Sequence, residues 1–236
     1  MQWLWQILKN ANSRIKAYCV VFVLLPNVHI LNGQNNNQYR LYYFGNTAVS
    51  NNHFSFSTGI HSMPQDDWQR VELRTGNSFS LASNINLGLG QRSNMTFVDH
   101  QLTSYEFRPF QKLSIQQFPH QALLLSHRFM LEERFFINQF ENNNFHARMR
   151  YRIEGNLNIK YSSNYYIRPM SELFYSFAND INSRFSQWKN TLAFGYMLNP
   201  KASIEFRYEY VLNRNESTTF ETDSLNGFRI QFVQTF

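Results

Sequence analysis

The sequence predicts an all-β fold, an antiparallel up-and-down transmembrane β-barrel of ten to twelve strands, preceded by an N-terminal signal peptide. Three observations support this class. Apolar and polar residues alternate over long segments, the apolar positions are rich in aromatic side chains, and the chain ends on an alternating segment with a terminal Phe. Hydrophobic residues make up 43% of the chain, yet the mean hydropathy is −0.46. The apolar residues are therefore interleaved with polar ones.

The first 33 residues have the pattern of a secretory signal peptide. Basic residues precede an apolar stretch over 17–25, which Pro26 ends and which is shorter than the about 20 residues that a membrane-spanning helix needs. We predict cleavage between Gly33 and Gln34; an uncleaved N-terminal anchor is the alternative. The only cysteine, Cys19, lies in this segment. The mature chain can therefore hold neither a disulfide nor a Cys-based metal or nucleophile site.

Eleven alternating segments follow, separated by clusters of Asn, Asp, Ser and Pro that are typical of turns. They cover 38–49, 53–63, 68–81, 83–95, 102–117, 122–137, 144–158, 164–178, 184–198, 202–215 and 224–236. Eleven conflicts with the even number that is usual for bacterial barrels. We expect that 38–49 is not a full strand or that another strand has been missed.

A soluble β-sandwich also alternates, so the period alone does not indicate a membrane. These segments are longer than the usual soluble strand and long enough to cross a bilayer. The last one resembles the signal that inserts barrels into the outer membrane, with its apolar residues on one face: Phe228, Ile230, Phe232 and Phe236. We predict a protein of the cell outer membrane of a Gram-negative bacterium, with outer-membrane lipid and the barrel-assembly machinery as partners.

Without the signal peptide the chain holds 19 basic and 16 acidic residues, so its charge does not indicate a nucleic-acid partner. The charges lie on the face opposite the aromatic residues, which would line the lumen. By parity this face holds fourteen basic and seven acidic residues. They are Arg70, Glu72, Arg74, Arg92, Glu106, Arg108, Lys112, Arg128, Glu132, Arg134, Arg148, Arg150, Arg152, Glu154, Arg168, Glu172, Lys189, Glu205, Arg207, Glu209 and Arg229.

Two interpretations of this charged face stay open. In a narrow barrel Arg and Glu of neighbouring strands can form a hydrogen-bonded ladder that fills the interior. Alternatively, the face lines a narrow passage that favours anions, because rings of Arg and Lys select anions in pores. Candidates for such a constriction are Arg128, Glu132, Arg134, Arg148, Arg150, Arg152, Glu154, Arg168, Glu172 and Arg207. The run Arg148, Arg150 and Arg152 is the strongest candidate, since its spacing places three guanidinium groups on one face of one strand.

Other functions have weaker support. A lipid hydrolase or acyltransferase would need Ser, His and a carboxylate close together, and His127, Glu133 and Ser171 are the only candidates. The histidines show no metal-binding spacing, and no cofactor motif is present. Gly88 and Gly90 fall within a strand and are expected to relieve crowding on the inner face. The outer loops 138–144 and 216–223 could form a platform for an outer-membrane protein partner.

Three motifs resemble a family of uncharacterised outer-membrane β-barrels common in Bacteroidota, known only as a domain of unknown function. They are His127–Phe135, Arg148–Arg152 and Pro169–Phe174, and the segments 194–196 and 208–210 also fit. The resemblance covers most of the mature chain. It departs at 42–45, where a Gly-Leu-Trp type strand would be expected. The resemblance implies a barrel and implies no activity.

Overall fold

The computed structural model describes residues 36–49, 52–63, 67–138, 144–159, 164–177, 184–214 and 222–236. The chain divides into two units, Met1–Gly33 and Gln34–Phe236, and every described residue belongs to the second. The predicted signal peptide, Cys19 and the cleavage position at Gly33 lie outside the described residues, so they remain predictions. Within the described ranges, no helix is long and apolar enough to cross a membrane.

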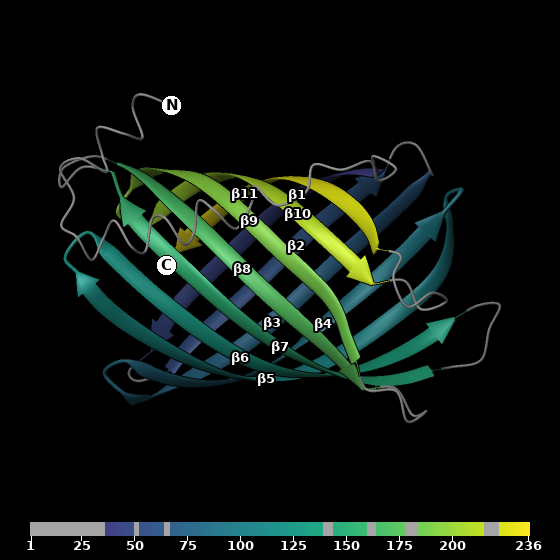
Figure 1. Cartoon of the computed structure of the whole chain (residues 1–236), viewed down its shortest axis with the longest axis horizontal. Helices are drawn as coiled ribbons and strands as arrows, with labels where there is room; N and C mark the ends of the chain where they lie inside the picture. The colour runs from purple at the N-terminus through teal and green to yellow at the C-terminus, as the bar shows by residue number, and fades with distance from the viewer. Residues whose placement is uncertain are drawn as a thin grey trace. The chain divides into compact units, whose positions relative to one another are not determined.

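Eleven strands form a closed barrel from the described residues (Figure 1). Their bounds are β1 Asn36–Val49, β2 Asn52–Met63, β3 Trp68–Ala82, β4 Ile85–Val98, β5 Gln101–His120, β6 Leu123–Asn138, β7 Asn144–Asn158, β8 Tyr165–Phe177, β9 Arg184–Asn199, β10 Ala202–Arg214 and β11 Thr222–Thr235. Strands that are neighbours in the sequence pair with one another in antiparallel fashion. The prediction of an all-β up-and-down barrel is confirmed.

The barrel closes through a parallel pair, which is where the structure departs from the prediction. β1 pairs with β11 in parallel from Asn36↔Leu225 to Asn46↔Thr235. In an up-and-down barrel with an odd number of strands, the first and last strands run in the same direction and can only meet in parallel. The expectation that 38–49 is less than a full strand was wrong, because β1 pairs along its length with β2 on one side and with β11 on the other.

The two ends of the barrel carry different connections. One end, called the short-turn end, has mostly short turns: two residues join β3 to β4, β5 to β6 and β9 to β10, whereas six join β7 to β8. At the other end the predicted loops 138–144 and 216–223 lie mostly outside the described residues. There β4 and β5 meet in a two-residue turn in which Asp99 and His100 both have positive φ, as a type I′ hairpin turn requires.

Burial in this barrel is the reverse of burial in a soluble protein. In β10, Glu205 and Glu209 are 0% exposed, whereas Phe206 and Tyr208 between them are 54% and 44% exposed. The same alternation along the other strands leaves large apolar side chains, such as Leu41 and Ile60, on the outside. A polar interior and an apolar exterior are typical of a barrel that spans a membrane.

The inner wall of β3–β5 depends on glycines, as predicted for Gly88 and Gly90. A Cβ at Gly90 would lie 2.5 Å from Phe110 Cζ and 2.4 Å from the carbonyl oxygen of Thr75. A Cβ at Gly88 would lie 2.2 Å from Lys112 Cε. Both glycines thus let a long side chain of β5 lie flat against the wall.

We expect Gly90→Ala to lower the free energy of unfolding by about 1–3 kcal/mol, because the added methyl group meets backbone as well as the Phe110 ring. The matched control is Gly155→Ala in β7, where the nearest atom to the added Cβ, Pro169 Cγ, is 3.6 Å away. Urea unfolding of the two refolded variants measures the difference. Equal stabilities would contradict the close approach at Gly90.

Candidate functional site

The lumen is the part of the described structure in which charged side chains gather. Because side chains alternate between the two faces of a strand, the residues predicted for the interior all project inward. Alternating Arg and Glu on neighbouring strands then bring guanidinium and carboxylate groups within reach of one another. Most of the buried carboxylates gather two or more cations, and the contacts differ from one carboxylate to the next.

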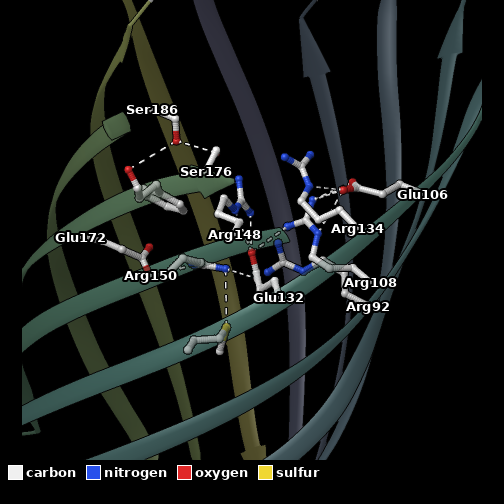
Figure 2. Close-up of polar contacts among 12 residues, drawn as sticks. Arg92, Glu106, Arg108, Glu132, Arg134, Arg148, Arg150, Glu172, Ser176 and Ser186 are labelled. Carbon is white, nitrogen blue, oxygen red and sulfur yellow. Dashed lines mark hydrogen bonds and ion pairs between the residues drawn. The ribbon is translucent and has the colours of Figure 1, made fainter. Parts of the chain in front are cut away.

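Glu132 of β6 is 1% exposed and lies among three arginines (Figure 2). Arg148 Nη2 lies 2.6 Å from Glu132 Oε2, and Arg150 Nη1 lies 2.5 Å from Glu132 Oε1. Arg108 of β5 approaches from the other side, with Nη1 3.7 Å from Oε2. This carboxylate therefore joins β5, β6 and β7.

Glu172 of β8 is 0% exposed and holds four cations. Arg150 Nη2 and Arg152 Nε lie 2.7 and 3.1 Å from Glu172 Oε1. Arg128 Nη2 lies 3.2 Å from the same oxygen, and Lys189 Nζ lies 3.7 Å from Oε2. Arg150 thus bridges the Glu132 and Glu172 carboxylates.

Glu209 of β10 extends the ion pairs to the parallel seam, the pair of strands β1 and β11 at which the barrel closes. Arg229 Nη2 of β11 lies 2.6 Å from Glu209 Oε1, Lys189 Nζ of β9 lies 3.9 Å from Oε2, and Arg40 of β1 pairs with Oε2. The Arg229 guanidinium also lies over the Tyr42 ring of β1, 4.5 Å from its centroid. Glu205, on the same strand, pairs with Arg207 and Arg168 at 2.6 and 2.8 Å.

Glu72 and Glu106 complete the circle. The Tyr42 hydroxyl donates to Glu72 Oε2 at 3.0 Å and also contacts His61 of β2. Arg92 of β4 lies 3.3 Å from Glu72. Glu106 of β5 accepts a hydrogen bond from Asn94 of β4 at 2.7 Å. Glu106 also pairs with Arg108 and Arg134, each at 2.6 Å.

Together these contacts form the lumen belt, a circle of polar contacts that crosses every strand interface of the barrel. We define it by Tyr42, His61, Glu72, Arg92, Asn94, Glu106, Arg108, Glu132, Arg150, Glu172, Lys189, Glu209 and Arg229. The ladder expected from the sequence thus has a counterpart in the structure, and its contacts bridge every pair of neighbouring strands.

A cavity of 980 Å³ runs along the lumen beside the belt. Met63 and Trp68 line it at the end with the longer connections, and Asn46 and Val233 line it near the opposite ends of their strands. Among its described lining residues are fourteen Arg and Lys side chains but only three carboxylates, those of Glu72, Glu154 and Glu209. The other four acids of the lumen lie behind the cations: Glu106, Glu132, Glu172 and Glu205.

The structure places the predicted constriction residues on this inner face, but it gives the predicted arginine run carboxylate partners. Arg148, Arg150 and Arg152 each lie within 3.1 Å of a Glu oxygen. Their role as an anion constriction remains a prediction. Arg40 was missed, although its even-numbered position beside Leu41 marks it as inward-facing, because it lies in the segment that was doubted as a strand.

The candidate enzyme residues lie on the outer face and have other partners. His127 Nδ1 is 2.9 Å from the Tyr151 hydroxyl, and Trp188 Nε1 donates to Ser171 Oγ at 2.9 Å. In the strand register Ile153 of β7 stands between His127 and Ser171. The structure thus does not bring these two residues together. Within the described ranges, no group of three or more potential metal ligands occurs.

Two neighbouring glutamates, one in the lumen belt and one on the outer face, allow a test of whether the belt stabilises the barrel. Glu132→Gln should lower the free energy of unfolding by about 3–5 kcal/mol, because it leaves buried guanidinium groups without their counter-charge. Glu133→Gln is the control, since Glu133 is exposed on the outer face opposite Ala147. Urea unfolding of the refolded proteins measures both. Similar losses in the two variants would show that the belt does not hold the barrel together.

Comparisons with known proteins place the chain in a family. No curated protein matches it. Among solved structures, the NanC porin is 12% identical with a TM-score of 0.49, and the match covers 82% of this chain and 96% of the porin. The β domain of the Bordetella autotransporter BrkA is 9% identical with a TM-score of 0.46, covering 78% of this chain and 83% of that domain. A family model matches residues 32–222, and the chain belongs to this family, described as "Protein of unknown function (DUF2490)".

Proposed function

We propose that this chain is an outer-membrane β-barrel of a Gram-negative bacterium whose lumen is a narrow passage favouring small anions. The Bacteroidota source suggested by the sequence motifs is part of the same proposal. The support comes from the two faces of the barrel, which suit two different surroundings.

The outer face supports a membrane location. Every strand has 12 to 20 residues, more than the 9–11 or so that a tilted strand needs to cross a bilayer. Large apolar side chains are exposed along the strands, among them Leu73, Leu131 and Leu192. Water would leave this apolar surface unfavourably hydrated, whereas lipid would cover it.

One observation supports the proposal that the lumen passes anions: cations face the cavity while most of the carboxylates lie behind them. Fourteen cationic side chains and three carboxylates are among the described residues lining the cavity. An anion inside would be attracted from several sides, and a cation would meet a wall of like charge. The cavity's extent along the strands is consistent with passage from end to end.

A structural barrel without transport is the second candidate, and the lumen belt is the observation that favours it. Its ion pairs, hydrogen bonds and one cation–π contact link each strand to the next across the interior. The two candidates differ in whether ions cross the barrel.

Membrane fractionation tests the location. We expect the protein in the outer-membrane fraction, with a band that shifts on boiling in a denaturing gel, because a closed barrel resists the detergent until it is heated. A soluble protein that does not shift would contradict the membrane proposal.

Conductance of the refolded protein in a planar bilayer tests the passage. Under a KCl gradient we expect small channels whose reversal potential shows preference for Cl⁻ over K⁺, and the preference should weaken at high salt because surface charge is screened. Protein denatured before addition is the control. A barrel silent at every salt concentration, or one that prefers K⁺, would overturn the anion passage, and silence would favour the structural role.

A further inference from the structure

The lumen contains two kinds of cation, those with a carboxylate partner and those without. Among the described lumen residues, Arg70, Arg74 and Lys112 have no carboxylate oxygen within 4.0 Å. Arg70 donates to Thr96 Oγ1 at 3.2 Å and lies over the Trp68 ring, close to the end with the longer connections. Arg74 and Lys112 lie farther along the β3–β5 wall, and neither forms a side-chain hydrogen bond with the described residues.

The part of the inner wall formed by Gly76, Gly90 and Phe110 holds Arg74 in place and leaves the hydrogen-bond donors of Arg74 unused. Gly76, Gly90 and Phe110 form one row across β3, β4 and β5. The Phe110 ring lies over both glycines, with Cζ 3.6 Å and 2.5 Å from the positions where their Cβ atoms would be. The Arg74 guanidinium stacks on this ring, 4.5 Å from its centroid. Stacking on an aromatic face leaves the N–H groups at the edge of the guanidinium plane free for another partner.

The strand register places other positive charges beside Arg74. Arg74 stands directly opposite Arg92 of β4, and Arg92 stands opposite Arg108 of β5. Like charges directly opposite each other destabilise a sheet unless a counter-charge is near. Arg92 and Arg108 have Glu72 and Glu106 as their counter-charges. For Arg74, Glu72 and Glu132 act only from beyond ion-pair distance.

Two further cations lie close to Arg74. Lys112 lies against Gly88 in the next row and interacts electrostatically with Arg74 and with Arg128 of β6, both of them positive. Arg128 has one carboxylate neighbour, Glu172, which it shares with three other cations. Arg74 and Arg128 line the cavity of 980 Å³, and Lys112 lines a second cavity of 290 Å³ towards the short-turn end.

We infer that Arg74, Lys112 and Arg128 form a binding site for a small oxyanion, a group with the chemistry of a carboxylate or a phosphate, on the β3–β5 wall of the lumen. The inference rests on the proposed passage and identifies where its solute is held. The planar edge of Arg74 supplies a two-pronged hydrogen bond to two oxygens, and Lys112 and Arg128 supply point charges. The site is lined from both cavities, with Arg74 and Arg128 in the larger one and Lys112 in the smaller one.

Equilibrium binding to the refolded full chain in detergent tests the site, with inorganic phosphate as the probe, acetate as the competing carboxylate and constant ionic strength. We expect saturable phosphate binding, competition by acetate, and a loss of affinity of about tenfold in Arg74→Gln and in Lys112→Gln, since hydrogen bonds to charged groups are the strong ones. The matched control is Arg70→Gln, which removes the same charge from the same strand and should change the affinity less than about twofold.

Further outcomes separate the possible explanations. Arg74→Lys keeps the charge and loses the planar fork, so its affinity should also fall. Equal losses in the Arg70 and Arg74 variants would mean diffuse attraction by the whole lumen, and absence of saturable binding would remove the site; either result overturns the inference. Boiling-dependent gel migration confirms that each variant is folded, and the Lys112 variant keeps the test decisive if an Arg74 variant fails to fold. Binding in detergent needs no current, so a barrel that binds phosphate without conducting would refute the passage alone.

Discussion

The burial of carboxylates beneath arginines is the interaction on which the rest of this barrel depends. Glu132, Glu172, Glu205 and Glu209 are at most 1% exposed, and a carboxylate at such depth is tolerated only with close counter-charges. Glu132, Glu172 and Glu209 receive cations from the strands on both sides, so neutralising these charges also ties neighbouring strands together. Glu205 pairs with Arg207 of its own strand and with Arg168 of β8. Replacing one ion pair by apolar residues could leave stability unchanged, but removing one partner leaves the other exposed to the full desolvation penalty.

The same arrangement explains why the lumen remains positive. Carboxylates have short side chains and stay near the wall, while the longer Arg and Lys side chains extend past them toward the centre. The belt therefore joins the strands at the wall, and the excess cations of the lumen line the cavity. The structural and the solute-related interpretations of the charged face thus describe two depths of one layer of side chains.

Alternation along the chain was enough to predict the strands, the two faces and nearly all of the charged lumen, because parity decides which way a strand side chain points. Parity does not determine register, and register decides which residues meet. The run Arg148, Arg150 and Arg152 looked like an uncompensated patch, but register places Glu132 and Glu172 beside it. Arg74, by contrast, is unremarkable in the sequence and becomes distinctive only because Arg92 and Phe110 are its neighbours. The parallel seam follows from the eleven alternating segments, but the even number usual for bacterial barrels led us to doubt 38–49 as a strand instead.

Because the number of strands is odd, the chain enters and leaves the barrel wall at opposite ends. In a barrel with an even number of strands the chain leaves the wall on the side where it entered. Here Asn36 opens β1 at the end of the longer connections, and Phe236 leaves β11 at the other end, where its amide donates to the carbonyl oxygen of Asn46 at 2.9 Å. In a membrane these two ends of the wall would face different compartments. Closing the seam would then require one terminal segment to be carried through to the far side before its last hydrogen bonds can form.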